Sequence, residues 1–233
     1  MRVLFAGVLF DFDGTLVDTS ELVIKSFQHT LAPYLGRTVA PEEIYPYFGI
    51  PLRDGLSAFV PGQPNLVEEM IPIYRRFSEE HFATLVRPCP GVREGLEELR
   101  AAGIKLGIVT SRVRDTTLYG LRLFNLEKFF PVVVTMEDVR SHKPAPEPVR
   151  RGLELLQLAP ADVAMIGDSP HDILAARAGG VTSVAAGWSR IPRERLLAAR
   201  PDAFVNTMAE FVDFCLEGNL AAADVCGRLS HEG

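Results

Sequence analysis

The stretch Val8-Leu9-Phe10-Asp11-Phe12-Asp13-Gly14-Thr15-Leu16-Val17-Asp18 is apolar up to Phe10 and then carries two carboxylates two residues apart. In an extended backbone this spacing places both side chains, Asp11 and Asp13, on one face of the chain. Gly14 follows directly, and a glycine permits a sharp turn or the close approach of a ligand to the backbone. The stretch therefore fits a buried strand that delivers two acids to one reaction centre, where a bound cation keeps them apart, or a strand that ends in an ordinary acidic turn.

Length and composition narrow the classes of protein to which this chain could belong. Its 233 residues suit one large domain or one domain with an insertion, and a hydrophobic content of 47% is enough for a packed core. The formal net charge of −6, without a run of basic residues, argues against nucleic acid or a membrane surface as a partner. The apolar run Val3 to Phe10 is too short to span a bilayer and leads into acids, so it is typical of a strand and not of a signal peptide.

Cysteine usage indicates the compartment. The three cysteines are odd in number and far apart in the sequence, which argues against a disulfide framework or a zinc site. We therefore expect a reducing, cytoplasmic location. The cysteines are Cys89, Cys215 and Cys226.

The segment from residue 15 to residue 88 differs from the rest of the chain in its pattern of apolar residues. Apolar residues recur there at roughly helical spacing, prolines and glycines separate these runs, and no strong strand pattern is present. We therefore predict a small α-helical unit, residues 15–88, inserted after the first strand. The apolar residues at helical spacing are Leu22, Ile24, Phe27 and Leu31, and then Leu66, Met70, Ile73, Tyr74 and Phe77.

From residue 89 onward the pattern alternates between strands and helices. This alternation predicts an α/β fold with a doubly wound parallel sheet, formed by residues 1–14 and 89–217, while residues 218–233 have the pattern of a frayed tail. The predicted strands cover 3–10, 104–109, 132–134, 163–166, 181–186 and about 203–205. The predicted helices cover 92–102, 115–124, 146–158, 172–178 and 208–216.

Polar residues follow four of the predicted strands. The carboxyl ends of parallel strands form one edge of a sheet, and ligands of doubly wound sheets bind beyond that edge. These polar residues can therefore meet at one site. In chain order they are Asp11 and Asp13 after the first strand, Thr110 and Ser111 after the second, Lys143 in the loop after the third, and Asp168 after the fourth.

Each of these residues also has an ordinary structural role open to it. Thr110 and Ser111 could cap the next helix, or could hold phosphate oxygens with their hydroxyl and backbone N–H groups. Lys143 could be a solvated surface lysine, or could supply a fixed positive charge to an anionic substrate and nucleophile. Asp168 could be only the N-cap of the helix that follows it.

A bound cation would make the acidic residues compatible with one another. An acid at position 168 that faces Asp11 and Asp13 would suffer strong like-charge repulsion unless a cation lay among the carboxylates. Oxygen ligands of this kind suit Mg²⁺, which binds through a few carboxylates and substrate phosphate. We therefore expect Mg²⁺ as the cofactor, and we expect His29, His142 and His171 to be polar surface residues and not metal ligands.

Together, the edge motifs resemble the four motifs of the haloacid-dehalogenase superfamily of phosphatases. The likeness covers nearly the whole chain, and the insertion at 15–88 resembles the helical cap of that superfamily. Within it the chain is similar to inorganic pyrophosphatases of the PpaX type, relatives of phosphoglycolate phosphatase, on the basis of residues 21–31, 106–111 and 142–149. It departs from the pattern in the pair Ser169-Pro170 and in a longer C-terminal tail. The four motifs are Asp11-Phe12-Asp13-Gly14-Thr15, Thr110, Lys143-Pro144 and Gly167-Asp168-Ser169-Pro170-His171-Asp172.

The resemblance implies a mechanism and a role for each residue. Asp11 would attack phosphorus to give an aspartyl-phosphate, while Asp13 would protonate the leaving oxygen and later take a proton from the attacking water. The metal ligands would be Asp11, the backbone carbonyl of Asp13, and Asp168, with Asp172 helping to hold the site. The cap would close over the substrate and select the leaving group. The groups that bind the transferring phosphoryl would be Thr110, Ser111, Lys143 and Gly14.

The narrower resemblance favours pyrophosphate as the substrate, which requires cationic or donor groups on the cap. Residues 15–88 contain six Lys/Arg and nine Asp/Glu, so only a few placed residues can supply them. Lys25 and His29 are four apart on the first predicted cap helix and are the best candidates. The other candidates are Arg37, Arg53, Arg75 and Arg76 on the cap and Arg112 and Arg114 on the core.

Several other activities stay open from the sequence. Phosphoglycolate or another small phosphomonoester is the alternative substrate, and a mutase of the β-phosphoglucomutase type would share every core residue. A phospho-receiver module that keeps its aspartyl-phosphate without turnover combines similar residues, but it resembles a shorter chain without a cap. A dehalogenase is disfavoured because Asp13 would then be idle. The sequence does not indicate an oligomeric state.

Overall fold

The computed structural model describes residues 3–218, so residues 219–233 of the predicted tail, and Cys226 with them, lie outside the described residues. The chain divides into two compact units. An α/β unit comprises the residues up to Val17 together with those from Pro88 onward, and a helical unit comprises Asp18–Arg87.

The α/β unit is built on a parallel sheet. Its strands are β1 (Gly7–Phe10), β4 (Lys105–Val109), β5 (Val132–Val134), β6 (Val163–Gly167), β7 (Thr182–Ala186) and β8 (Ala203–Val205). They form one six-stranded sheet in the order β5-β4-β1-β6-β7-β8, and each neighbouring pair is parallel, which confirms the predicted doubly wound sheet. Phe10 is in register with Ile108 of β4 and Ile166 of β6, so the three central strands end at the same edge.

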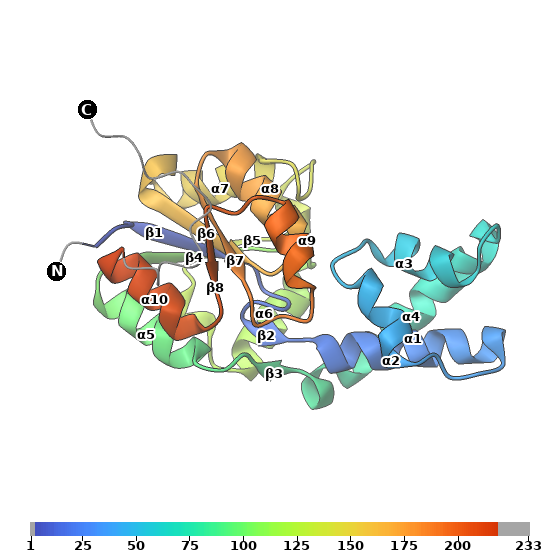
Figure 1. The fold of residues 1–233 in the computed structure, drawn as a ribbon. Coiled ribbons are helices and arrows are strands. Elements are labelled where there is room, and N and C mark those ends of the chain that lie inside the picture. The colour runs from blue at the N-terminus through green and yellow to red at the C-terminus, as the bar shows by residue number, and fades with distance from the viewer. Residues whose placement is uncertain (1–2, 219–233) are drawn as a thin grey trace. The chain divides into compact units, whose positions relative to one another are not determined.

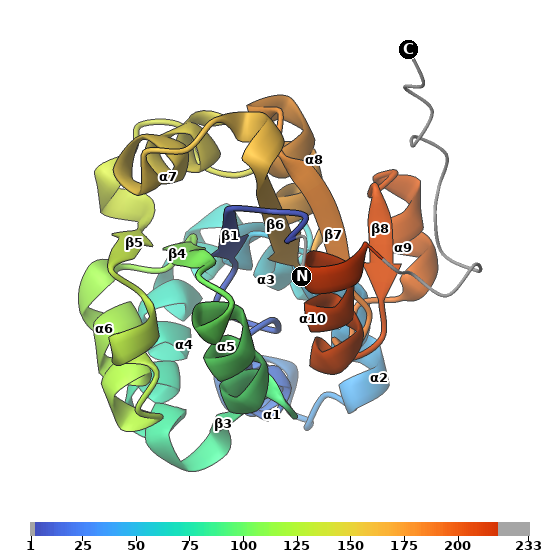
Figure 2. The same cartoon turned by 90° about the vertical axis from the view of Figure 1, so that its left-hand side faces the viewer.

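Helices cover both faces of this sheet. They are α5 (Val92–Ala101), α6 (Arg114–Leu123), α7 (Glu147–Leu156), α8 (Pro170–Gly179), α9 (Arg193–Ala198) and α10 (Met208–Glu217), with short 3₁₀ turns at Glu127–Phe129 (η2), Met136–Asp138 (η3) and Pro160–Asp162 (η4). In Figure 1, α7 and α8 lie on one face of the sheet and α5 and α10 on the other. Figure 2 shows α5 and α10 side by side. Each face of the sheet therefore buries apolar side chains, as in other doubly wound sheets.

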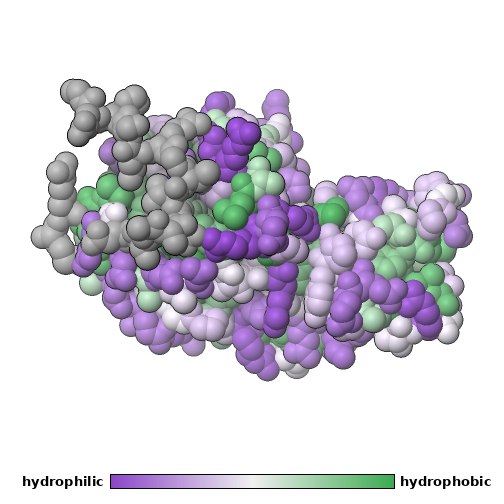
Figure 3. Space-filling view, in the orientation of Figure 1, coloured by the Kyte–Doolittle hydropathy of each residue, from purple (hydrophilic) through white to green (hydrophobic). Residues whose placement is uncertain are grey.

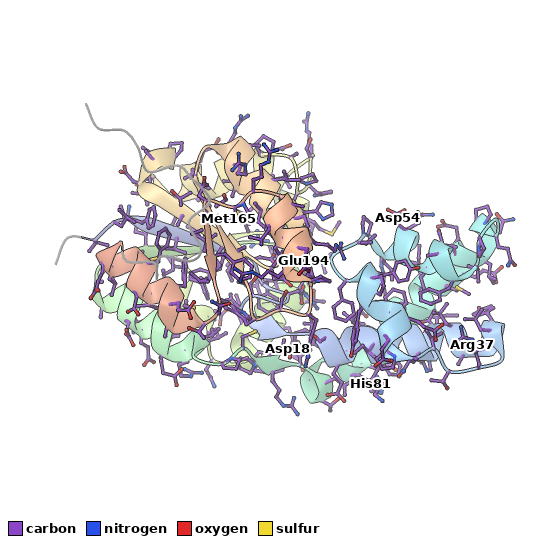
Figure 4. All side chains as sticks on the ribbon, viewed as in Figure 1. Asp18, Arg37, Asp54, His81, Met165 and Glu194 are labelled. Atoms are coloured by element: carbon purple, nitrogen blue, oxygen red, sulfur yellow. The ribbon has the colours of Figure 1, made fainter. Side chains whose placement is uncertain are left out.

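The central strand owes its continuous apolar sequence to burial on both faces. Val8, Leu9 and Phe10 are each 0% exposed. Leu9 belongs to a core cluster that includes Met165 of β6 (labelled in Figure 4). The strand begins at Gly7 and not at Val3 as predicted, because the preceding N–H groups bond outside the sheet: those of Leu4 and Ala6 donate to carbonyls in α10 and η4.

A tight turn follows β1. The N–H of Gly14 donates to the carbonyl of Val17 at 2.7 Å, and the N–H groups of Leu16 and Val17 donate to the carbonyl of Phe12 at 3.0 and 3.1 Å. The turn keeps Thr15 to Val17 in the α/β unit, so the helical unit begins three residues later than the predicted position 15. The short strands β2 (Val17–Asp18) and β3 (Arg87–Pro88) pair at the two points where the chain passes between the units.

The helical unit contains α1 (Ser20–Leu35), α2 (Pro41–Ile44), a 3₁₀ turn at Tyr45–Tyr47 (η1), α3 (Leu52–Phe59) and α4 (Pro64–Leu85). The apolar residues at helical spacing form its core, since Phe27, Leu31 and Met70 are at most 3% exposed. The ring of Phe27 on α1 packs against the ring of Tyr74 on α4, with centroids 5.3 Å apart. The predicted inserted helical unit is therefore present.

Hydrophilic residues are spread over the face seen in Figure 3, with smaller hydrophobic areas between them. Within residues 3–218, every helix is too short or too polar to cross a membrane.

Candidate active site

The ends of the central strands direct the candidate residues to one edge of the α/β unit. Asp11 follows β1 directly, and its N–H donates to the carbonyl of Ile166 at 2.9 Å. Thr110 follows β4, and its N–H donates to the carbonyl of Val134 at 3.0 Å. These bonds extend the ladder by one residue and fix the direction in which both side chains leave the sheet. Asp168 follows β6 in the same way, and Lys143 comes from the loop between η3 and α7.

Lys143 is the centre of a buried network of charges. Its Nζ donates to Asp11 Oδ1 at 2.6 Å, to Asp172 Oδ1 at 2.5 Å and to the carbonyl of Val109 at 3.1 Å. The side chains of Lys143, Asp11 and Asp172 are only 5%, 9% and 2% exposed. All three ammonium hydrogens thus have acceptors, so the lysine is held in place and shielded from water.

Asp172 is oriented by the first turn of α8. Ser169 is the N-cap of this helix, and its N–H and hydroxyl donate to Asp172 Oδ2 at 3.0 and 2.6 Å. This capping box leaves Oδ1 of Asp172 for Lys143. Gly167 is required beside it, because a Cβ there would lie 2.3 Å from Asp172 Cβ. The Ser169-Pro170 pair, noted above as a departure, therefore forms a normal helix start, with proline in the first turn.

Gly14 makes room for Asp168. Its φ is +75°, which favours glycine, and a Cβ at this position would lie 2.0 Å from Asp168 Oδ2. The carboxylate of Asp168 therefore lies directly against the turn that follows β1. The N–H of Gly14 donates to the carbonyl of Val17, and a contact of Gly14 with phosphate stays a prediction.

The structure excludes three ordinary structural roles at the sheet edge. The N-cap of α6 is Val113 and that of α8 is Ser169, so neither Thr110 nor Asp168 is a helix cap. Lys143 is buried and is not a solvated surface lysine. The hydroxyl oxygen of Thr110 accepts the N–H of Arg112 at 3.2 Å, which leaves the hydroxyl hydrogen for another acceptor. Ser111 is exposed at the same edge.

The carboxylate of Asp13 has its own partner. Arg112 Nη1 donates to Asp13 Oδ1 at 2.9 Å and to Oδ2 at 3.2 Å. The sequence offered Arg112 only as one of several possible substrate contacts, because a pairing between residues 99 positions apart leaves no local pattern. Arg114, offered in the same way, instead donates to Asp138 Oδ2 at 2.5 Å and to the carbonyl of Val133 at 3.2 Å.

Three carboxylates form a compact acidic cluster. Asp11, Asp168 and Asp172 offer oxygens that lie within 4.8 Å of one another. Burial raises the pKa of Asp11 to about 7, against the lowering effect of Lys143 and with a further rise from Asp172. Burial, and then the charges of Asp11 and Asp172, hold the pKa of Asp168 well above its usual range. Burial opposes the charge on Lys143, but the two carboxylates outweigh it and raise the pKa of this lysine.

The charges at this edge fit a divalent cation. The three clustered acids and Asp13 carry four formal negative charges, and Lys143 and Arg112 supply two positive ones. Burial is the main cause of the raised pKa values of Asp11 and Asp168, and the neighbouring acids raise both values further. A hard cation would remove the imbalance, and an all-oxygen donor set of carboxylates suits Mg²⁺. Asp172 belongs to this acidic cluster and also holds Lys143, whereas the sequence indicated only a supporting role for it around the metal site.

Several of the predicted substrate contacts on the helical unit have partners within that unit. The ring of His29 on α1 stacks on Phe77 of α4 with centroids 4.5 Å apart, and Phe77 stacks on His81 at 4.0 Å. Lys25 and His29 are both exposed on α1, and their contact with substrate stays a prediction. Figure 4 shows Arg37 beyond the end of α1. Three of the arginines pair with acids: Arg37 with Glu43 at 2.7 Å, Arg53 with Glu68, and Arg76 with Glu80 at 2.9 Å.

Comparisons with known proteins agree with this geometry. Residues 8–186 match the family described as haloacid dehalogenase-like hydrolase. A pyrophosphatase PpaX from Bacillus pumilus is 43% identical over 205 residues, which cover 88% of this chain and 94% of that protein. The solved structure of a haloacid dehalogenase-like family hydrolase from Streptococcus pneumoniae has a TM-score of 0.80 at 25% identity, covering 90% of this chain and 98% of that one. A Thermotoga maritima protein assigned as a beta-phosphoglucomutase has a TM-score of 0.73 at 30% identity, covering 89% and 96%.

Proposed function

Because the chain belongs to the haloacid dehalogenase-like hydrolase family, we propose that it is a Mg²⁺-dependent phosphohydrolase that works through an aspartyl-phosphate on Asp11, with pyrophosphate as its substrate. One observation carries the proposal. The Asp11 carboxylate stands at the end of the central strand, with Oδ1 held by Lys143, inside a cluster of acids that needs a cation.

Asp11 is the nucleophile. Lys143 fixes one of its oxygens at 2.6 Å, which orients the carboxylate and leaves the second oxygen to attack phosphorus. The attack forms the Asp11 Oδ–P bond as the bond from phosphorus to the leaving oxygen breaks, so one difficult step becomes two easier ones. Water then attacks phosphorus and releases phosphate and free Asp11.

Asp13 is the proton carrier for both steps. It gives a proton to the leaving oxygen in the first step and takes one from the attacking water in the second. Its carboxylate lies outside the acidic cluster and is partly exposed, so it can reach a bound substrate. Asp11 is instead buried, so the two acids of the motif have different surroundings, as their different roles require.

Lys143, Thr110 and Ser111 are placed to bind the transferring phosphoryl group. Lys143 is a fixed positive charge, and the hydroxyl hydrogen of Thr110 is free of the Arg112 bond, which uses only the oxygen. Mg²⁺, held by Asp11, Asp168 and the backbone carbonyl of Asp13, would neutralise charge on the transferring group when bound. Asp172 keeps Lys143 and the cluster in position.

Pyrophosphate as substrate is supported by the relative from Bacillus pumilus, which is named a pyrophosphatase. A small phosphomonoester is the second candidate, and the likeness to a protein assigned as a beta-phosphoglucomutase makes phosphoryl return to the substrate a third outcome to measure. The ratio of kcat/KM values across such a panel reports which leaving group the protein selects.

The test compares wild type, Asp11→Asn and the matched control Asp162→Asn, an exposed aspartate in η4 at the opposite end of β6. Phosphate release from pyrophosphate and phosphoglycolate is measured with Mg²⁺ and with EDTA. We expect Asp11→Asn to lose on the order of 10⁴-fold or more in kcat, as the loss of a nucleophile does elsewhere. Asp162→Asn should match wild type. Near wild-type turnover by Asp11→Asn, or undiminished turnover in EDTA, would show that the proposal is wrong.

A further inference from the structure

Arg112 lies in the loop after β4 and contacts Asp13, the second acid after β1. Its Nη1 lies 2.9 Å from Asp13 Oδ1 and 3.2 Å from Oδ2. The Arg112 side chain is 20% exposed and that of Asp13 is 34% exposed, so the pair is partly shielded but open to a ligand. One nitrogen therefore meets both carboxylate oxygens, with the closer contact to Oδ1.

Hydrogen bonds from its backbone and side chain hold Arg112 in place. Its backbone N–H donates to Thr110 Oγ1 at 3.2 Å, and its carbonyl accepts the N–H of Met136 at 3.1 Å. Its Nε donates to Thr116 Oγ1 at 3.3 Å, and the guanidinium lies 5.8 Å from the centroid of the Phe12 ring. The guanidinium is thus fixed by several weak contacts before any ligand arrives. Holding a reacting group in advance is how side chains reduce the entropic cost of a reaction.

We propose that Arg112 is a positioning residue that holds the Asp13 carboxyl for proton transfer to the leaving oxygen and from the attacking water. The inference rests on the proposed function, because it requires Asp13 to be the proton carrier. Arg112 acts through Asp13 and forms no bond to phosphorus.

The geometry agrees with the proton balance. In the first step the Asp13 O–H bond breaks and a bond from this hydrogen to the leaving oxygen forms, while phosphorus passes to Asp11. In the second step an O–H bond of water breaks, its hydrogen returns to Asp13, and the water oxygen bonds to phosphorus as the Asp11–P bond breaks. Arg112 Nη1 contacts Oδ1 at 2.9 Å and Oδ2 at 3.2 Å. When Asp13 is protonated on Oδ2, the longer contact is given up and the shorter bond to Oδ1 keeps the carboxyl in place.

A positioning role has a signature that a general stabilising role lacks. An alkoxide leaving group is strongly basic and needs a proton as it departs, whereas a nitrophenolate leaves readily without one. Loss of Asp13 or of its orientation should therefore slow the alkyl phosphate far more than the nitrophenyl phosphate. Loss of a plain phosphate contact should slow both equally.

The experiment uses the full chain with Mg²⁺ and measures kcat/KM for phosphoglycolate and for p-nitrophenyl phosphate. The variants are Arg112→Ala, Arg112→Lys, Asp13→Asn and the double variant Asp13→Asn/Arg112→Ala. The matched control is Arg114→Ala, an arginine two residues away whose guanidinium is directed to Asp138. Circular dichroism and the fluorescence of Trp188, the single tryptophan, show whether each variant is folded.

We expect Arg112→Ala to lose about 10²-fold on phosphoglycolate, as a displaced reacting group does, and far less on p-nitrophenyl phosphate. Arg112→Lys should recover part of the loss on phosphoglycolate, because it keeps a cationic donor. The double variant should be no slower than Asp13→Asn alone, because Arg112 has nothing to position once the acid is gone. Arg114→Ala should match wild type on both substrates.

Other outcomes separate the two proposals. Equal losses on both substrates in Arg112→Ala, or losses that add in the double variant, would show that Arg112 binds substrate directly and would overturn the inference. If Asp13→Asn itself slows both substrates equally, the proton-carrier role in the proposed function fails. Should Arg112→Ala not fold, Arg112→Met takes its place, because it keeps much of the side chain but removes every donor. Equal losses on the two substrates, or no loss on either, would then refute the positioning role.

Discussion

Replacing Lys143 by methionine should destabilise the metal-free protein strongly. Methionine is close to lysine in length but removes the ammonium that contacts Asp11 at 2.6 Å and Asp172 at 2.5 Å. Removing one partner of a buried ion pair typically costs about 3–5 kcal/mol, because the other charge is left buried without compensation. Since two carboxylates lose their partner here, we expect a loss at the upper end of that range at pH 8.

The loss should depend on pH with a definite sign. In the wild type, burial raises the pKa of Asp11 from its ordinary value of 3.8 to about 7. The folded protein then keeps a proton that the unfolded chain releases, so the metal-free protein loses stability as the pH rises from about 4 to about 7, by about 4 kcal/mol in total. Without Lys143 the pKa of Asp11 rises further. The variant therefore continues to lose stability above pH 7, where the wild type no longer does, and the difference between them grows from pH 7 to pH 8 by up to about 1.4 kcal/mol.

Urea unfolding in EDTA at pH 5.5 and pH 8 measures both effects. The fluorescence of Trp188 reports on the α/β unit, because its Nε1 donates to the carbonyl of Thr15 at 3.2 Å. The control is Lys128→Met, which removes a surface pair with Glu97 at 3.7 Å whose side chains are about half exposed and which should be worth about 0–1 kcal/mol. A loss below about 1 kcal/mol for Lys143→Met at both pH values would refute the reasoning that Lys143 compensates the buried acids.

Three further predictions follow from the same site. Gly14→Ala should abolish activity and lower the midpoint of thermal unfolding by more than Gly36→Ala, since both glycines have positive φ but only at Gly14 would a Cβ meet Asp168; equal effects would contradict this. Mg²⁺ should raise the unfolding temperature more at pH 8 than at pH 6, because protons compete for Asp11 and Asp168, whose pKa values are raised, and an increase that is the same at both pH values would be evidence against the acidic cluster as the metal site. Cys215, whose pKa is raised by burial, should resist iodoacetamide until the protein unfolds, as mass spectrometry of the labelled peptide can show.

Much of the fold could be predicted because its strands carry strong local signals. The continuous apolar run before Asp11 is required by burial on both faces of a parallel sheet, and the run itself ends where the carboxylates begin. Helix α9 was missed because its six residues are too few to show a helical period. The start of β1 was placed too early because residues 3–6 are also partly apolar, yet their N–H groups bond to α10 and η4. These are tertiary contacts that no local pattern records.

The candidate site also has a part that the sequence predicts and a part that it does not. Asp11, Thr110 and Asp168 could be placed because each immediately follows a strand of a parallel sheet. Which side chains then meet was not predictable. Lys143 reaches both Asp11 and Asp172 across separations of 132 and 29 residues, and the role of Gly14 depends on how closely Asp168 approaches it. The sequence predicts which residues lie at the edge of the sheet. Which of their side chains contact one another depends on the course of the loops, which the sequence does not show.

The distribution of positive charge bears on how the protein selects its substrate. On the helical unit, Arg37, Arg53 and Arg76 are paired with acids, so they add little net charge to attract an anion. On the α/β unit, Lys143 and Arg112 also face carboxylates. The chemistry of the leaving group then gives a further basis on which the protein can discriminate between substrates.

Phosphate, which leaves from pyrophosphate, is far less basic than the alkoxide that leaves from phosphoglycolate, so it depends less on a proton from Asp13. If Arg112 holds Asp13 for that proton, Arg112→Ala should shift the ratio of kcat/KM values toward pyrophosphate even as both values fall. A shift toward phosphoglycolate would mean that Arg112 instead recognises the second phosphate of pyrophosphate. The same pair of substrates therefore distinguishes the orientation of Asp13 by Arg112 from the binding of pyrophosphate by Arg112.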